Sequence, residues 1–165
     1  MLEYHTQGNN STDEIQLYGV SYGVMPNWTP SVVFNGSKGS SIMMGPRPQT
    51  EYRERIDQLR AQSSTIAMTA QVSNQGELSA KVAITNLSMT YQGNARLYAV
   101  IYEDLNISQN HYVVRDITPE QTVTMPGHGS ASYEIKTGLA SNPGRHMVII
   151  LKSTSGTILQ SQFVM

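Results

Sequence analysis

Histidines and acidic residues are the side chains of this sequence that could bind a metal ion or exchange protons. The chain has four histidines and no cysteine, and no two histidines are spaced as H-x-H or H-x-x-x-H. Zinc and related metals need several closely grouped His, Cys or carboxylate ligands, so we predict no metal site. His5 and His111 stand at the borders of expected strands, where we expect each to serve as a hydrogen-bonding group. The histidines are His5, His111, His128 and His146.

Two neighbouring pairs of carboxylates, Asp13-Glu14 and Glu103-Asp104, are candidates for acid–base catalysis. Successive side chains of a β-strand point to opposite faces, so Glu103 and Asp104 could not flank one glycosidic bond from the strand expected there. Arg115 lies in the next apolar segment, HYVVRDI. We therefore expect Glu103 or Asp104 to pair with Arg115 across neighbouring strands, a contact that contributes about 0.2–1 kcal/mol.

Serine and glycine are abundant, yet they form no nucleophile or phosphate motif. The sequence contains no G-x-S-x-G stretch, in which a strained turn would expose a catalytic serine. The stretch GSKGS, residues 36–40, lacks the G-x-x-x-x-G-K-[ST] spacing of a phosphate-binding loop and is typical of a hairpin loop. We therefore predict that the protein is not an enzyme, with no catalytic residue and no cofactor.

Charge and hydropathy argue against two classes of partner. The 11 Lys+Arg and 12 Asp+Glu residues leave a net charge of −1, and charged residues make up 14% of the chain. Such a surface has no field that would attract nucleic acid or an anionic membrane. No stretch approaches the ~20 apolar residues of a membrane-spanning helix. We expect neither nucleic acid nor a membrane span, and instead an unidentified protein partner.

The hydrophobic pattern changes between Ala61 and Thr65. Before this point, SVVFNG predicts a strand, Asn35-Gly36 a tight turn, and SSIMMG the partner strand of a hairpin. The stretch PRPQTEYRERIDQLRAQ then predicts an amphipathic helix, because its apolar residues recur at spacings of three and four. A shorter helix is expected earlier, within EIQLYGVSYGV.

After residue 65 the sequence predicts one strand after another, separated by turns rich in Gly, Asn, Pro and Ser. TIAMTAQVS and ELSAKVAITN alternate between apolar and polar residues, which is typical of strands with one buried face. ARLYAVIYED and HMVIILKS are apolar at nearly every central position and are expected to lie centrally in their sheets. With further strands in HYVVRDI, QTVTM, SASYEIKTG and TILQSQFVM, this pattern predicts an antiparallel β-sandwich of the immunoglobulin or fibronectin type over residues 65–165.

A proline stands at the entrance of the SVVFNG strand of the earlier region, in WTPSVVFNG. Together with the hairpin and the helix in TEYRERIDQL, this stretch resembles the second half of a thioredoxin-like domain. The resemblance implies a partial thioredoxin-like unit over residues 1–62, made of a strand, a helix, a cis-proline loop, a hairpin and a helix. The cis bond would join Thr29 to Pro30, where a strand entrance requires no backbone N–H. The predicted fold class is therefore α+β, with this α/β unit followed by the β-sandwich.

The order of the two units resembles a group of bacterial extracytoplasmic proteins, the outer-membrane-protein-related thioredoxin-like proteins with an immunoglobulin-like C-terminal domain. The Cys-x-x-Cys of active thioredoxins would lie in the half of the domain that this sequence does not contain. The resemblance therefore implies a non-catalytic interaction or scaffold protein of the cell envelope. It implies a location in the periplasm, at the outer membrane or outside the cell, with a leader absent from this sequence. Thr29 and Pro30 would be structural, with a residual contact to an extended peptide.

Three alternatives remain open. The chain could be the C-terminal fragment of a thiol-disulfide oxidoreductase whose Cys-x-x-Cys lies upstream. It could be a carbohydrate-binding sandwich whose tyrosines stack on sugars. The incomplete sheet of the unit over residues 1–62 could also pair with a second copy of the chain, which would give a homodimer. The tyrosines of the sandwich are Tyr91, Tyr98, Tyr102, Tyr112 and Tyr133.

Overall fold

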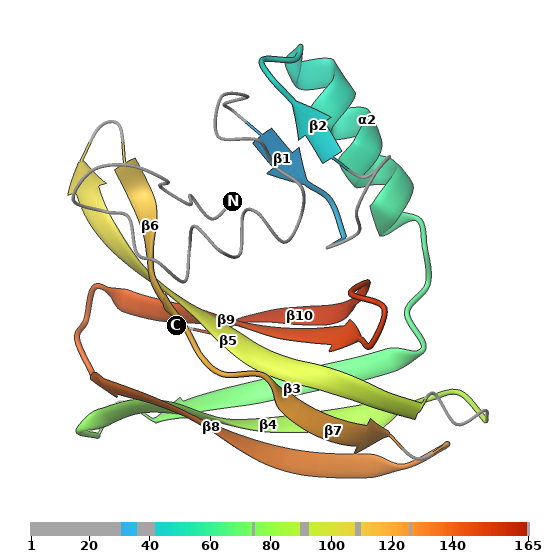
Figure 1. Ribbon diagram of the computed structural model, residues 1–165, viewed down its shortest axis with the longest axis vertical. Coiled ribbons are helices and arrows are strands. Elements are labelled where there is room, and N and C mark those ends of the chain that lie inside the picture. Colours follow the sequence, from blue (N-terminus) through green and yellow to red (C-terminus); the bar gives the residue numbers. More distant parts are fainter. Residues whose placement is uncertain are drawn as a thin grey trace.

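The computed structural model consists of β-strands and one helix over the residues that it describes (Figure 1). The described residues are 31–35, 42–73, 75–89, 93–107, 110–125 and 127–164. The helix expected within EIQLYGVSYGV and the bond between Thr29 and Pro30 lie outside them. The division of the chain into units over 1–62 and 65–165 therefore stays a prediction.

The predicted α+β class is wrong, because strands dominate the described residues and those before Ala61 contribute only two short strands and one helix, not a thioredoxin-like α/β unit. This early part contributes an antiparallel ribbon of two short strands, β1 (Ser31–Val33) and β2 (Ile42–Met44), in which Val32 lies opposite Met43. A single helix, α2 (Gln49–Arg60), follows among the described residues. The local predictions of a hairpin and a helix are confirmed. They did not establish the class, since a hairpin followed by a helix occurs in many folds.

Three strands form the smaller sheet, in the order β3-β4-β8. Their burial patterns alternate between a more buried and a more exposed side chain, as the sequence predicted for β3 and β4. The buried side chains of β4 include Leu78, Val82 and Ile84, and the exposed residues between them are small or polar. The strands are β3 (Ile66–Ser73), β4 (Glu77–Asn86) and β8 (Ser130–Ala140).

Five strands form the larger sheet, in the order β10-β9-β5-β6, with β7 paired to the first part of β5. The two strands predicted to be central are central, because β9 lies between β10 and β5, and β5 pairs with β9, β6 and β7. The strands are β5 (Gly93–Ile107), β6 (Asn110–Ile117), β7 (Gln121–Met125), β9 (Arg145–Ser153) and β10 (Ile158–Val164).

The two sheets face each other across an apolar core (Figure 1). Leu97 and Ile149 come from the larger sheet, and Val82 and Ile135 come from the smaller one. Each of these side chains is almost completely buried, which stabilises the fold by about 1.5–3 kcal/mol for each large aliphatic group. This packing makes the layers between Ile66 and Val164 a sandwich.

Thr118 bridges the point where β5 changes partner from β7 to β6. Its Oγ1 accepts a hydrogen bond from the Ala99 N–H (2.9 Å), and its own N–H donates to the Ala99 carbonyl (2.9 Å). Thr118 is buried, so these bonds satisfy backbone groups that water could not reach. A threonine side chain thus replaces one step of the strand ladder and lets the chain pass from β6 to β7.

Candidate functional site

The outer face of the larger sheet, which points away from the smaller sheet, is apolar and covered. Its central side chains come from β5, β6 and β9 and have between 0% and 8% of their surface exposed. A strand with one face in water alternates apolar with polar residues. The middles of β5 and β9 are instead apolar on both faces. We call this set the outer apolar cluster: Tyr98, Val100, Tyr102, Val114, Val148 and Ile150.

The hairpin β1–β2 and helix α2 lie on this side of the larger sheet (Figure 1). The backbone carbonyl of Asn35, just after β1, accepts a hydrogen bond of 3.0 Å from the N–H of Ile158 in β10. Ile158 packs against the outer apolar cluster, and Phe34, beside Asn35, is itself buried. A segment far earlier in the sequence is therefore attached to the border of this face.

Aromatic side chains mark the border of the cluster along β9 and β10. The ring of Tyr102 lies 5.5 Å from the ring of Phe163 and 5.4 Å from the ring of His146, measured between centroids. Phe163 is 52% exposed, although Tyr102 beneath it is buried. The exposed ring is continuous with the covered apolar face, so it offers a hydrophobic contact to a molecule outside the chain.

The opposite border of the cluster carries charge. The Lys152 ammonium lies 5.2 Å from the centre of the Tyr98 ring and forms an ion pair with Glu120. A cation above an aromatic ring is attracted by the negative face of the ring. This arrangement holds the Tyr98 ring in place and gives the apolar face a polar border.

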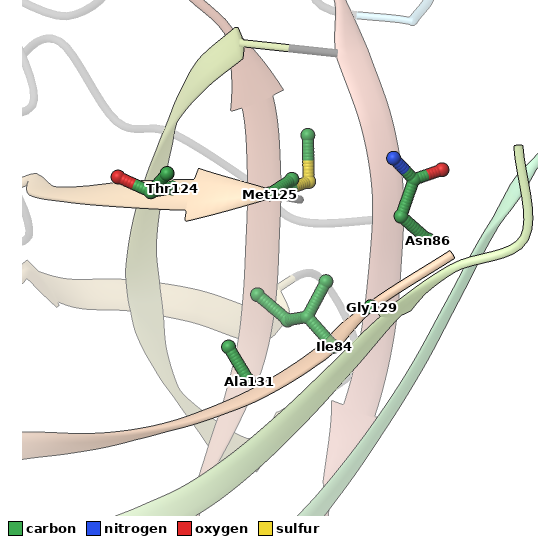
Figure 2. Close-up of a pocket in the computed structure, with 6 residues that line it drawn as sticks. All are labelled: Ile84, Asn86, Thr124, Met125, Gly129 and Ala131. Carbon is green, nitrogen blue, oxygen red and sulfur yellow. The ribbon is translucent and has the colours of Figure 1, made fainter. Parts of the chain in front are cut away.

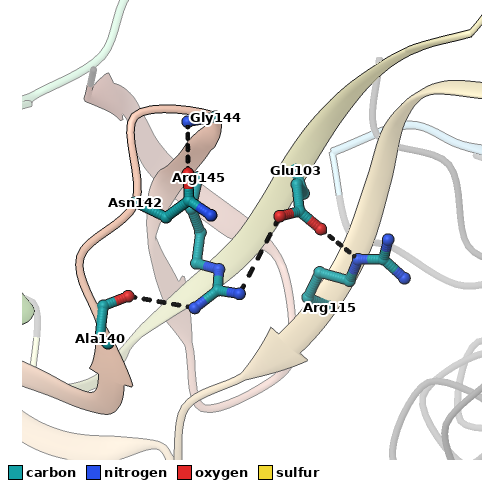
Figure 3. Close-up of polar contacts among 6 residues, drawn as sticks. All are labelled: Glu103, Arg115, Ala140, Asn142, Gly144 and Arg145. Atoms are coloured by element: carbon teal, nitrogen blue, oxygen red, sulfur yellow. Dashed lines mark hydrogen bonds and ion pairs between the residues drawn. The ribbon is translucent and has the colours of Figure 1, made fainter.

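Glu103 lies between two guanidinium groups at the end of the larger sheet (Figure 3). Its Oε2 accepts a hydrogen bond of 2.8 Å from Arg115 Nε, which confirms the pairing predicted between β5 and β6. Its Oε1 lies 4.0 Å from Nη2 of Arg145, whose Nη1 donates to the Ala140 carbonyl (3.1 Å). The carboxylate is thereby engaged in joining three strands, and its surroundings favour a structural role over proton transfer.

The other histidines and carboxylates that the structure describes do not gather into one site. His128 is exposed in a turn with φ of 46°, and His146 contacts Tyr102 in β5. No group of three or more potential metal ligands occurs among the described residues. His5, Thr29 and Pro30 lie outside these residues, as does the side chain of His111.

Three tyrosines of the sandwich have described side chains, and none of the three exposes a full ring face for sugar stacking. Tyr98 and Tyr102 are buried in the outer apolar cluster and present no ring face to solvent. Tyr133 is half-buried, and its hydroxyl donates to the Thr124 carbonyl (3.1 Å). The side chains of Tyr91 and Tyr112 lie outside the described part of the structure.

Residues of the described sandwich line at least two hollows. The first, shown in Figure 2, is apolar and has no room for a water molecule, so it closes the core and holds no ligand. It is lined by Ile84, Asn86, Thr124, Met125, Gly129 and Ala131. The second is an open hollow of about 320 Å³ beside β8, where the chain passes from β6 to β7. It is lined by Thr118, Pro119, Glu120, Gln121, Glu134, Ile135 and Lys136.

The outer apolar cluster is the candidate site that sequence reasoning missed. The signal was present, because ARLYAVIYED and HMVIILKS carry apolar residues at both odd and even positions. This pattern was interpreted as a central place in the sheet, which is correct. Strands that are apolar on both sides also require a covered second sheet face, and that second face is the candidate site.

No protein-family model matches this sequence, and no curated protein matches it. Solved structures that match part of the chain include β-glucosidases. One from Listeria innocua in complex with isofagomine is 13% identical, with a TM-score of 0.37, over 61% of this chain and 16% of that chain. DesR, a β-glucosidase from Streptomyces venezuelae in complex with D-glucose, is 11% identical, with a TM-score of 0.41, over 61% and 15%. A β-glucosidase from Kluyveromyces marxianus in complex with glucose is 15% identical, with a TM-score of 0.33, over 69% and 17%.

The chain spans less than a fifth of the length of these enzymes. Similarity at this level of identity and TM-score gives no ground for transferring an activity or a substrate. Among the described residues, no helix is both long enough and apolar enough to cross a membrane.

Proposed function

We propose that this chain is a non-catalytic interaction protein whose binding platform is the border of the outer apolar cluster around Phe163. The observation that carries the proposal is the Phe163 ring, which is 52% exposed although it lies 5.5 Å from the buried ring of Tyr102. The outer apolar cluster is continuous with this half-exposed ring, which extends it into solvent.

The platform has the composition expected of a protein contact. Aromatic residues are enriched in protein interfaces, and here the exposed ring of Phe163 contacts the buried ring of Tyr102. The partner class is a protein segment that covers Phe163 with an apolar side chain.

The cell envelope is the proposed location. Its support is the low charge content together with the high content of uncharged polar residues, a composition common in exported β-rich proteins. The two arginines around Glu103 add support for a non-catalytic role, since they engage one of the two neighbouring carboxylates, Glu103 and Asp104, that the sequence analysis compared with a glycosidase pair.

Site-specific photocrosslinking in the full chain tests the platform. A benzoylphenylalanine residue at position 163 would lie on the platform, and one at position 69 would lie on the exposed face of the smaller sheet. We expect position 163 to yield one recurring protein adduct in the native host and position 69 to yield none. Equal adducts from both positions, or none from position 163, would refute the proposed platform.

A further inference from the structure

β8 is a long strand at the open edge of the smaller sheet. It pairs with β4 on one side, and no other described strand pairs with it on the other. Its inward side chains are mostly half-buried, with Ile135 the one fully buried residue of the strand. An edge of this length offers backbone N–H and C=O groups to another strand.

Groups outside the sheet already reach the backbone of this edge. The carbonyl of Glu134 accepts a hydrogen bond of 2.9 Å from the side-chain amide of Gln121, which begins β7. The open hollow of about 320 Å³ lies alongside the same residues. An additional strand would find space for its inward side chains in this hollow, and its backbone N–H would replace the Gln121 amide at the Glu134 carbonyl.

The charges along β8 match those of a second β8 strand running in the opposite direction. Glu134 and Lys136 are both exposed on the outer face of the sheet and flank Ile135. In an antiparallel pair centred on Ile135, Glu134 of each copy lies opposite Lys136 of the other. Within one chain, Lys81 already lies opposite Glu134, so the row across two copies would alternate in sign.

We infer that two copies of this chain associate through β8, joining two smaller sheets into one continuous sheet around a twofold axis at Ile135. Such an interface is self-complementary, as a twofold dimer requires. The inference does not depend on the platform of the larger sheet, because β8 belongs to the other sheet.

Two charge reversals test this register. In Glu134→Lys, lysine occupies both positions, and in Lys136→Glu, glutamate occupies both. Each variant alone would bring like charges together twice in a dimer, and we expect its self-association to weaken by about tenfold or more. Mixed in equal amounts, the two variants have opposite charges at every facing pair, and we expect a heterodimer at least as stable as the wild-type dimer. Sedimentation equilibrium measures the association, and native mass spectrometry identifies the mixed species.

Two exposed residues of helix α2 supply controls with the same changes in net charge. Glu54→Lys and Arg53→Glu should leave dimerisation unchanged, alone or mixed. A wild-type chain that stays monomeric into the high micromolar range would overturn the inference. So would single β8 variants that dimerise as the wild type does, or a mixture of folded variants without heterodimers.

Discussion

The outer faces of the two sheets differ in chemistry although the sheets share one core. The smaller sheet presents Lys81, Ala83 and Thr85 outward from β4, and water covers them in whole or in part. The larger sheet presents Tyr98, Val100 and Tyr102 outward from β5, and all three are buried. The smaller sheet therefore ends the fold on its side, whereas the larger sheet is an inner layer that needs protein on both faces.

The difference follows from strand composition. In β4, polar or small residues alternate with aliphatic ones, so one face suffices for burial. In β5 and β9, tyrosine and branched aliphatic residues occupy successive positions. Leaving the second face of these strands in water would expose a contiguous apolar patch, which monomeric proteins rarely do.

The same carboxylate introduced on each of the two outer faces should produce the largest difference in stability. Val100→Asp places a carboxylate within the outer apolar cluster, and we expect it to destabilise the fold by roughly 4 kcal/mol or more. Ala83→Asp places the same group on the exposed face beside Thr69 and Ser132, and the expected change is within about 1 kcal/mol. Denaturant unfolding of both variants measures the contrast.

If Val100→Asp does not fold, its loss from the soluble fraction beside a soluble Ala83→Asp gives the same contrast. Similar, small losses of stability in the two variants would mean that the outer face of the larger sheet is open to water. The outer faces of the two sheets would then not differ in burial.

A second pair of substitutions compares threonine hydroxyls in the two sheets. Thr118→Val leaves the buried Ala99 N–H without its acceptor, and we expect a loss of about 1–3 kcal/mol. Thr137→Val removes the bond of its hydroxyl to the Leu78 carbonyl and the acceptor of the Leu139 N–H, but at a half-buried site that water can enter, so the expected loss is smaller, about 1 kcal/mol. Thermal unfolding ranks the two. The reverse order would show that the larger sheet is not the more deeply enclosed one.

The smallest expected contrast concerns two glutamates. Glu103→Gln removes the charge that two arginines share, and we expect a loss of about 1–2 kcal/mol, because the Glu103 side chain is only 20% exposed. Glu77→Gln alters an exposed acceptor of the Gly138 N–H and should change stability less. A double-mutant cycle of Glu103→Gln with Arg115→Met isolates the ion pair. A coupling energy of zero would show that the contact contributes nothing to the sheet.

Local patterns predicted most of the strands, the hairpin, helix α2 and the pairing of Glu103 with Arg115. These features depend on alternation, turn residues and charge in neighbouring strands, all of which are visible in the sequence. The predicted fold class was based instead on the resemblance of short segments to a family. A hairpin with one helix is too common to identify a thioredoxin-like unit. The change of β5 from partner β7 to partner β6 at Thr118 could not be predicted either. In the sequence, a threonine that replaces one hydrogen bond of the strand ladder cannot be distinguished from a loop threonine.

The candidate site was predictable only in part. Continuous apolar runs in β5 and β9 imply two covered faces, but they do not say which segment covers the second one. The hydrogen bond between Ile158 and Asn35 joins residues more than a hundred positions apart. The hydrophobic periodicity of the sequence does not predict such a contact.

Hydroxyl-radical footprinting of the native full chain tests most directly whether the outer face of the larger sheet is covered. Tyr98 and Tyr102 are 1% and 2% exposed, and Phe163, on the border of the same face, is 52% exposed. We predict rapid oxidation of Phe163, with Tyr98 and Tyr102 protected until the chain is unfolded in denaturant. Oxidation of the two tyrosines in the native chain at a rate close to that of Phe163 would contradict the account.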